Sequence, residues 1–591
     1  MTKPIWINLI NSEGNYTGNT PKSSRYKDRH VSRPRSDESK SLNTQYSRIT
    51  LRYMILAETK KLATEVYIDL SEVTFKVLSR REVGIQFWAL SNLSFHAHTS
   101  DQSFIFSVPN FGTLEDEQGG GHNRHMTRKQ VIVVRTGTAN IGSVMVGLQR
   151  AGAIPIVSAP YVMIPGVGSF GSALEKIKSS EWENYIKCRI DKGLPTMLIC
   201  VGLQMLARES EESPFAQGLH IIDQMVTKFP ESLVVPQQAW NYVISDEGSK
   251  YVGEGYAYFS NSYKMDSAPE GWTASYSHYG SSFIAAIERG NVLATQFHPE
   301  LSGEYGISIL RRWLGVSEPL SVEKVGQFPT TKKIPRIIPC LDIKGGQVVK
   351  GIKFQNISGA GDPAERAAIY QAQGADEIVV LDISATEEER KTTAETIEQI
   401  RKQISIPLCV GGGIRSVSDA ERILEAGADK VAVNTAAVKT PEIITQMAEK
   451  FGKQCTVLSL DAALRLQPSK EPTHSPWEVV IYAGKERTGM DAVSYARESV
   501  HRGAGEILLT SWDRDGTKSG YDVELLRAVS QAVNVPVIAS GGGSSSKDMA
   551  DALSHGADAV LAASIFHYNE TTVVRVKQDL RDLGFTVRLE G

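Results

Sequence analysis

The feature that most constrains the fold is an internal repeat in the C-terminal part of the chain. Matching segments recur at a constant offset of 129 residues, as between Gly427 and Gly556. Each half has the pattern of four strand–helix units, and eight such units in about 250 residues are the size of one closed (β/α)8 barrel. We therefore predict a barrel from residue 334 to residue 591. The matching segments are Ala375–Leu381 with Ala504–Thr510, Ile406-Pro407 with Val535-Pro536, and Gly427–Val431 with Gly556–Val560.

The rest of the chain is long enough for further domains, because 591 residues exceed one hydrophobic core. Strand and helix patterns alternate from Val131 to Trp313, which indicates an α/β domain with a parallel sheet covered on both faces. Residues 11 to 48 have the polar composition of a disordered segment, and strand-like runs follow at Val66–Leu70 and Val73–Leu78. The predicted domains are an N-terminal extension of unknown role at 1–128, the α/β domain at 129–314, a linker at 315–333 and the barrel at 334–591.

The charge balance and the cysteine pattern exclude several classes of ligand. A formal net charge of −3 argues against nucleic acid as the main ligand. Five cysteines without a Cys-x-x-Cys pair form neither a disulfide framework nor a zinc motif, which indicates a reducing compartment. No apolar run approaches the roughly 18–20 residues that span a bilayer. We expect a cytoplasmic protein, or a plastid protein if the extension contains a transit peptide.

Two aspartates mark the mouth of the predicted barrel. Asp342 ends the first predicted strand and Asp461 ends the fifth. Active sites of such barrels lie at the carboxyl ends of the strands, and the two halves are equivalent, so the two carboxylates should face each other across the mouth. Two opposed carboxylates suit general acid–base catalysis, one donating a proton while the other accepts. The alternative for either residue is a structural role, capping a helix or binding a loop amide.

Glycine-rich strand ends give a second signal. They follow the third and fourth strands in one half and the seventh and eighth in the other. Glycine lets backbone N–H groups approach an anion, and a following helix N-terminus adds its dipole. Two such sites imply a long substrate with a phosphate at each end, whereas the alternative is that the glycines only permit tight turns. The candidate phosphate-binding residues are Gly412, Gly413, Asn434, Thr435, Ser540, Gly541, Gly542, Ala563 and Ser564.

The α/β domain carries a candidate nucleophilic triad. Cys200 lies at a strand-to-helix turn, where a helix N-terminus favours the thiolate. The segment Gln296-Phe-His298-Pro-Glu300 supplies a base and a carboxylate that orients it. The loop Pro165-Gly166-Val167-Gly168 and the backbone N–H of Val201 are candidate donors to an oxyanion. Each residue alone would more often be structural, with the cysteine as inert packing and the histidine as a loop hydrogen-bonder.

The barrel resembles the cyclase subunit of imidazole glycerol phosphate synthases over its whole length. The motifs that carry the resemblance are Ile338–Asp342, Val348–Gly351, Val410–Ile414, Ala432–Ala436, Asp513–Thr517 and Ala539–Gly542. The resemblance implies that Asp342 and Asp461 are the acid–base pair and that Lys350 is a mobile-loop residue near the substrate. It also places Asp513, Asp515 and Gly516 beside the site.

The resemblance implies a specific reaction as well. Ammonia and a bis-phosphorylated formimino-aminoimidazole carboxamide ribulotide (PRFAR) would give imidazole glycerol phosphate. The other product would be an aminoimidazole carboxamide ribotide (AICAR), which returns to purine synthesis.

The α/β domain resembles class I glutamine amidotransferases, through the Pro165–Gly168 loop together with Cys200, His298 and Glu300. This resemblance implies that the domain hydrolyses glutamine and supplies the ammonia. The sequence departs from that family where Leu198 replaces a glycine, and at Arg135, Ala239 and Asn261. The stretch from Ala153 to Pro160 is too short for the usual second strand and helix, so we expect a trimmed fold there.

Ammonia protonates in water, so it should travel inside the protein. Because the substrate would lie at the C-terminal face of the barrel, we expect the glutaminase domain to dock on the N-terminal face. Four charged residues at strand starts are the candidate gate there, namely Arg336, Glu377, Lys430 and Glu506. Glu377 and Glu506 are equivalent in the repeat. The alternative is a charge layer that only stabilises this face of the barrel.

The function that the sequence favours is therefore a bifunctional amidotransferase–cyclase, with glutamine and PRFAR as substrates and with neither a cofactor nor a metal. One alternative is an ammonia-dependent cyclase whose glutaminase half is impaired. A second is a phosphoribosyl sugar isomerase, which uses a similar repeat and aspartate pair but needs no ammonia. A non-catalytic scaffold would need neither the aspartates nor two glycine cradles.

Overall fold

The computed structural model describes most of the chain from residue 49 to residue 589. It contains two compact units, residues 1–97 and residues 98–591. In the first unit the described residues form an antiparallel sheet of β1 (Ile49–Ala57), β2 (Lys60–Asp69) and β3 (Thr74–Leu78). The predicted strand-like runs coincide with β2 and β3, whereas the predicted disorder of residues 11 to 48 lies outside the described residues. Also outside are residues 58–59, 70–73, 79–128, 135–140, 152, 156–159, 167, 180–181, 325, 331, 353–354, 360, 383–386, 470 and 472–473.

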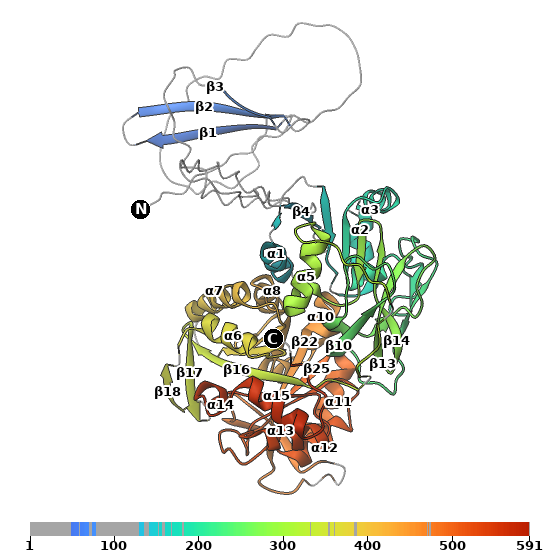
Figure 1. Ribbon diagram of the computed structural model, residues 1–591. Coiled ribbons are helices and arrows are strands. Elements are labelled where there is room, and N and C mark those ends of the chain that lie inside the picture. The colour runs from blue at the N-terminus through green and yellow to red at the C-terminus, as the bar shows by residue number, and fades with distance from the viewer. Residues whose placement is uncertain are drawn as a thin grey trace, which may run out of the picture. The chain divides into compact units, whose positions relative to one another are not determined.

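Eight parallel strands of the second unit close into a barrel (Figure 1). β16 pairs with β19 on one side and with β27 on the other, so the ring of strands is complete. The closed barrel predicted from the repeat is thereby confirmed. Its strands are β16 (Arg336–Lys344), β19 (Ile378–Asp382), β20 (Leu408–Gly411), β21 (Lys430–Val433), β22 (Thr456–Leu464), β25 (Glu506–Ser511), β26 (Val537–Ser540) and β27 (Ala559–Ala562).

The helices around the barrel show the repeat in how they begin. Ser416 and Ser545, 129 residues apart, each accept the backbone N–H three residues later and so cap α8 and α13. Asp362 and Asp491 do the same for α6 and α11. Such acceptors satisfy free N–H groups at a helix start. The helices are α6 (Pro363–Ala372), α7 (Glu387–Gln403), α8 (Val417–Glu425), α9 (Thr435–Lys439), α10 (Glu442–Phe451), α11 (Ala492–Arg502), α12 (Val523–Ser530), α13 (Ser546–Ser554), α14 (Ser564–His567) and α15 (Val573–Asp582).

Two hairpins extend the barrel strands. They are formed by β17 (Gln347–Ile352) with β18 (Gln355–Gly359), and by β23 (Trp477–Ile481) with β24 (Glu486–Asp491).

Alternate residues of each barrel strand face the interior. Along β16, Arg336, Ile338, Cys340 and Asp342 therefore form one row from the N-terminal end to the mouth. The middle of the interior is apolar, because all eight strands contribute to one buried cluster. Its members are Ile338, Cys340, Val379, Cys409, Ala432, Val457, Leu508, Ile538, Ala559 and Leu561.

The α/β domain is built on one sheet in the order β11-β10-β13-β14-β15-β7-β6-β4-β5. The part from β15 to β5 is parallel, as predicted. The prediction of a parallel sheet needs correction for the rest, because short turns at Gly280 and at Gly290-Asn291 join β13, β14 and β15, and strands joined so tightly pair antiparallel. The strands are β4 (Lys129–Val133), β5 (Ala153–Pro155), β6 (Tyr161–Ile164), β7 (Thr196–Ile199), β10 (Gln237–Ser245), β11 (Gly255–Asn261), β13 (Thr273–Tyr279), β14 (Ser281–Arg289) and β15 (Val292–Thr295).

The domain also contains a small three-stranded sheet. It is formed by β8 (Glu209–Ser210), β9 (Met225–Lys228) and β12 (Tyr263–Lys264). The helix that follows Cys200 is short and ends at Gln204. Arg208 N–H instead donates to the carbonyl of Gln224, which leads the chain into β8. The helices of the domain are α1 (Ile141–Arg150), α2 (Phe170–Ser179), α3 (Trp182–Asp191), α4 (Val201–Gln204) and α5 (Gly303–Trp313), with the 3-10 turn η2 (Pro299–Leu301).

The edge of this sheet is shorter than usual, but it keeps its strand. β5 pairs in parallel with β4, so the stretch that was expected to be too short for a strand and a helix together does hold a three-residue strand. Only residues 156–160 separate β5 from β6. A helical crossover between parallel strands needs a dozen or more residues, so no helix of that kind fits there.

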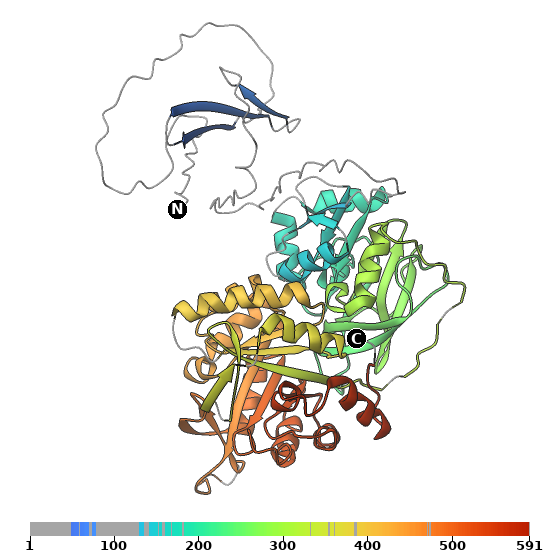
Figure 2. The same ribbon diagram turned by 60° about the vertical axis from the view of Figure 1, so that its left-hand side comes forward.

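The α/β domain docks against the barrel (Figure 2). Trp240 of β10 donates its indole N–H to the carbonyl of Asp376, 2.9 Å away, immediately before β19. Arg588 stacks on the same indole, 4.0 Å from the ring centroid. Trp240, Tyr258 and Leu301 belong to the main hydrophobic cluster of the barrel, so the interface is packed like a core. The contacts lie at strand starts, which is the N-terminal face that the sequence predicted.

Candidate active sites

Asp342 and Asp461 lie near the carboxyl ends of β16 and β22 at the barrel mouth. The strands run on to Lys344 and Leu464, so neither aspartate is the last residue of its strand as predicted. Burial and the negative charge of Asp515 raise the pKa of Asp342 to about 7, against a hydrogen bond from Cys340. Burial likewise raises the pKa of Asp461 to about 7, against a hydrogen bond from Asn434. Two carboxyl groups that titrate near neutral pH can be protonated on one residue and ionised on the other. That is the state in which one donates a proton while its partner accepts one.

The glycines of the predicted phosphate loops are required by the backbone. Gly412 and Gly413 have φ angles of 88° and 67°, and Gly541 and Gly542 have 88° and 94°. Other residues rarely adopt this left-handed region. A Cβ at Gly412 would also lie 1.9 Å from the carbonyl oxygen of Asp382. The tight turns are therefore present in both halves, and phosphate binding by their N–H groups stays a prediction.

The other candidate phosphate residues occupy matching places in the two halves. Thr435 begins α9 and Ser564 begins α14, each following a residue outside the helix, Asn434 or Ala563. Ser540 is the last residue of β26. The hydroxyl of Thr435 accepts the backbone N–H of Tyr482 and donates to Asn434 Oδ1, each at 3.3 Å.

The remaining residues implied for the barrel site lie on the loop after β25 and, for Lys350, in β17. Asp513 accepts the backbone N–H of Leu464 at 2.7 Å, so it fixes the end of β22. Asp515 acts electrostatically on the carboxyl groups of both Asp342 and Asp461. Gly516 has a φ of 73° in the same loop. Lys350 lies in β17, and its side chain lies outside the described residues.

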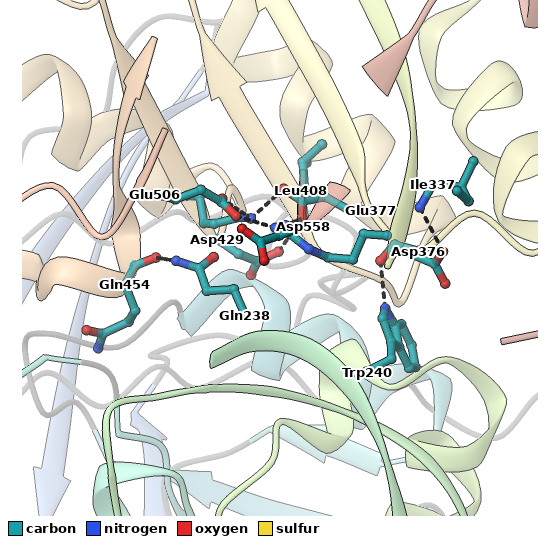
Figure 3. A network of polar contacts seen from close by, with 12 residues as sticks. Gln238, Trp240, Ile337, Asp376, Glu377, Leu408, Asp429, Gln454, Glu506 and Asp558 are labelled. Atoms are coloured by element: carbon teal, nitrogen blue, oxygen red, sulfur yellow. Dashed lines mark hydrogen bonds and ion pairs between the residues drawn. The ribbon is translucent and has the colours of Figure 1, made fainter. Parts of the chain in front are cut away.

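Arg336, Glu377, Lys430 and Glu506 form a closed charged ring at the strand starts. Arg336 pairs with both glutamates. Lys430 Nζ lies 2.6 Å from a carboxylate oxygen of each glutamate. Figure 3 shows the two glutamates beside Gln238 and Trp240, which β10 of the α/β domain brings to this face.

Arg336, Lys430 and Glu506 keep their charges although they are fully buried. Burial opposes charge on each of these three, but the partner charges outweigh it. Glu506 and Glu377 raise the pKa of Arg336 and of Lys430, and the two cations lower the pKa of Glu506. Two positive and two negative groups cancel within the ring, which limits the penalty for burying them.

The triad residues of the α/β domain lie together. His298 Nδ1 is 2.9 Å from Glu300 Oε1, and both side chains are buried. Burial lowers the pKa of His298, but the charges of Glu300 and Cys200 outweigh it and hold that pKa well above its usual value. Cys200 has φ 55° at the turn between β7 and α4. A non-glycine residue in this region marks a strained turn, and such turns cluster at functional sites.

One of the candidate oxyanion donors already donates a hydrogen bond within the protein. A Cβ at Gly166 would lie 2.4 Å from the backbone nitrogen of Gly202, so only glycine fits against the nucleophile turn. The N–H of Val201 donates to the carbonyl of Gly166 at 3.4 Å, and it must leave that partner to bind an oxyanion. Gly168 has φ 111°. Val167 lies outside the described residues.

Both halves match known families. Residues 336–572 match the model described as histidine biosynthesis protein, and residues 153–314 match glutamine amidotransferase class-I. The imidazole glycerol phosphate synthase subunit HisF of Dehalococcoides mccartyi is 55% identical over 257 residues, 43% of this chain and 98% of that relative. The same subunit is 53% identical over 254 residues in Nocardia farcinica, covering 43% and 98%, and in Mycobacterium tuberculosis, covering 43% and 94%. The chain belongs to the imidazole glycerol phosphate synthase family.

In this member of the imidazole glycerol phosphate synthase family, a glutamine amidotransferase half and a cyclase half share one chain. It is an enzyme of histidine biosynthesis with glutaminase and cyclase halves. Among the described residues, no cluster of three or more His, Cys, Asp or Glu side chains could hold a metal ion. No helix in the described part of the chain is long and apolar enough to cross a membrane.

The departures from the amidotransferase pattern can be located. Leu198 lies within β7 and is not among the residues with positive φ; the strained backbone is at Cys200 instead. Ala239 is buried in β10. The amide of Asn261 donates to the carbonyl of Tyr263 at 2.8 Å. Arg135 lies outside the described residues.

Two glutamines contact the triad and were not singled out from the sequence. Gln296 Nε2 lies 3.6 Å from Cys200 Sγ, and Gln204 holds the other end of the same amide. The available signal was the position of Gln296, two residues before His298 in the segment that supplies the base. A polar residue there, directly after the buried strand β15, needs partners for its amide.

Proposed function

We propose that this chain is a glutamine-dependent imidazole glycerol phosphate synthase, with Cys200 as glutaminase nucleophile and Asp342 and Asp461 as the acid–base pair of the cyclase. One observation carries the proposal. The row Arg336, Ile338, Cys340 and Asp342 runs through the barrel from the face where the glutaminase half docks to the mouth. This arrangement joins a source of ammonia to a place that uses it.

In the glutaminase half, His298 takes the thiol proton of Cys200, and the thiolate attacks the side-chain amide carbon of glutamine. Glu300 holds the imidazole by its Nδ1 and stabilises the positive charge that forms on it. The N–H groups of Gly168 and Val201 are the proposed donors to the oxyanion, after Val201 leaves Gly166. Ammonia departs with the proton from His298, and water then releases glutamate from the sulfur.

Ammonia passes through the charged ring and the apolar interior above it. The ring closes the N-terminal face to water. Neutral ammonia can pass when one ion pair of the ring opens. The apolar cluster offers no group that would protonate it. At the mouth, ammonia attacks PRFAR, and the two aspartates move the protons that ring closure and bond cleavage require.

The substrate spans the mouth with a phosphate at each end. Gly412, Gly413, Asn434 and Thr435 hold one phosphate, and the equivalent loops around Ser540 to Gly542 and Ala563-Ser564 hold the other. Asp513, Asp515 and Gly516 lie on a loop of the barrel mouth, and Lys350 lies in β17. The products are imidazole glycerol phosphate and AICAR. The proposed compartment is the cytoplasm, or a plastid if residues 1–128 contain a transit peptide; five free cysteines agree with a reducing environment.

The test is a coupled assay of the full chain with PRFAR and glutamine, following glutamate and AICAR together. The proposal predicts both products in near-equal amounts. AICAR with ammonium salt but not with glutamine would instead support an ammonia-dependent cyclase. No AICAR with either nitrogen source would contradict the cyclase assignment.

A further inference from the structure

Gln296 is a buried amide beside the proposed nucleophile. Its side chain is 1% exposed, and its Nε2 lies 3.6 Å from Cys200 Sγ. Thr295 faces Ile199 in the parallel register of β15 and β7, so Gln296 and Cys200 leave the sheet side by side. The N–H of Cys200 also donates to the carbonyl of Thr295 at 2.6 Å. Strand pairing therefore fixes the distance between the amide and the sulfur.

The contacts on the far side of Gln296 decide which of its amide atoms faces the sulfur. The carbonyl of Tyr263 can only accept, and Gln204 Nε2 donates to it at 3.1 Å. The same Nε2 donates to Gln296 Oε1 at 3.0 Å. Turning Gln296 over would place two N–H groups against each other. The NH2 group of Gln296 must therefore point at Sγ.

A donor aimed at the sulfur favours the thiolate over the thiol. A hydrogen bond to a charged acceptor is stronger than one to a neutral acceptor. The acceptor for a thiol proton is poorer, because the carbonyl of Ser260 lies 4.0 Å from Sγ. His298 is held through Nδ1 by Glu300, so its Nε2 is the nitrogen left to take the thiol proton. The two neighbours of Cys200 thus act in the same direction.

We propose that Gln296 is a further catalytic residue of the glutaminase half, donating to Cys200 Sγ and stabilising the thiolate, with Gln204 as the positioning residue that fixes its orientation. The inference rests on the proposed role of Cys200 as nucleophile. When the thiol ionises, the S–H bond breaks, the electron pair stays on sulfur and the proton goes to His298 Nε2. Gln296 itself neither gains nor loses a proton.

The direct test is the pH dependence of Cys200 alkylation by iodoacetamide, measured by mass spectrometry on the full chain. Gln296→Met removes the donor, and Gln296→Glu places a carboxylate oxygen against the sulfur while still accepting from Gln204. We expect the alkylation midpoint to rise by about one pH unit in the first variant and by more in the second. Cys188 is exposed and serves as an internal control whose midpoint does not move.

Two further variants separate this role from a structural one. Gln204→Met frees the orientation of Gln296 and should shift the midpoint in the same direction by a smaller amount. Gln237→Glu is the matched control, because Gln237 is equally buried in β10 but bonds to Asn241 and Asn261, and it should leave the midpoint unchanged. Ammonium-dependent turnover shows that the cyclase half of each variant is folded, and an unchanged melting temperature of the full chain shows the same for the glutaminase half.

Turnover gives the second readout. Glutamine-dependent turnover of Gln296→Met should fall on the order of tenfold at pH 7 and recover partly at pH 9, because one pH unit is a factor of ten in thiolate. Alkylation midpoints equal to wild type in both Gln296 variants would overturn the proposal. Since alkylation needs no turnover, that outcome is distinct from a wild-type chain that fails to use glutamine.

Discussion

The cyclase half and the glutaminase half position their candidate site residues in different ways. The barrel repeats its elements, so Asp342 and Asp461 hold matching places and the caps of α8 and α13 recur 129 residues apart. The glutaminase half has a shortened edge at β5, where no crossover helix fits. Its triad nevertheless lies away from that edge, because Cys200 directly follows β7, and His298 and Glu300 come after β15, at η2. The comparison teaches that a sheet edge can be shortened when no residue of the site depends on it.

The two candidate sites also differ in which residues adopt the left-handed backbone conformation. The candidate phosphate loops of the barrel place their left-handed backbone at glycines such as Gly412 and Gly541. The glutaminase half places it at Cys200 itself, a residue with a side chain. Such a conformation persists only when the surroundings determine it. The neighbours of Cys200 should therefore be more sensitive to small changes than the neighbours of the barrel loops.

The largest effect is expected at the barrel mouth. Asp342→Asn and Asp461→Asn should each lower ring formation by about 10²–10⁴-fold, because each removes an acid–base group. Glutamine hydrolysis should persist in both variants, since the triad is intact. The measurement is AICAR formation with saturating ammonium salt. Near-normal rates in either variant would remove the aspartate pair from the mechanism.

A smaller effect is expected where α1 meets the triad. A Cβ at Gly147 would lie 2.9 Å from the Cβ of Glu300. Gly147→Ala should therefore displace Glu300 and lower glutamine-dependent turnover on the order of tenfold, although alanine improves helix propensity by about 1 kcal/mol. Ammonium-dependent turnover is the internal control and should not change. An equal loss of both activities would mean that the substitution disturbs the whole fold instead.

A change of a few-fold is expected at the charged ring. Arg336→Ala and Lys430→Ala should leave both half-reactions competent but release ammonia to solvent, so that more glutamine is hydrolysed per imidazole formed. The ratio of glutamate to AICAR measures this directly. A ratio that stays near one in both variants would leave a stabilising charge layer as the better account of the ring.

The smallest effect is on stability. The pKa of Asp342 is raised to about 7 in the folded chain, from an ordinary value near 4 when unfolded. The folded state then binds the extra proton, so this group destabilises the fold increasingly as pH rises from about 4 to 7, and fully above that. Asp342→Asn should raise Tm by a few degrees at pH 8 and leave it unchanged at pH 4. If the wild type and Asp342→Asn had equal Tm values at pH 8, burial of the ionised Asp342 carboxylate would not destabilise the fold.

Much of this account could be predicted from the sequence because the relevant signals are periodic. The constant offset, as between Glu377 and Glu506, predicts the barrel. Side chains alternate between the two faces of a strand, which puts Arg336 and Asp342 on the same face of the first strand. The retained strand β5 was not predictable, because three residues of strand have no pattern of their own and depend on pairing with β4.

Side-chain orientation could not be predicted either. The direction of the Gln296 amide is set by Tyr263, far along the chain, through Gln204. The engagement of Val201 N–H by Gly166 is likewise a contact between separate segments. Sequence patterns give the residue types at such places, and only the packed structure gives their hydrogen-bond partners.

The central claim is that a glutaminase half with a shortened edge still drives the intact barrel. The most direct measurement compares glutamine-driven with ammonium-driven AICAR formation in the full chain and in Cys200→Ala. The account predicts that wild type uses both nitrogen sources, whereas Cys200→Ala loses glutamine-driven turnover and keeps the ammonium-driven rate. A wild-type chain that uses only ammonium, or a Cys200→Ala variant that still uses glutamine, would contradict it.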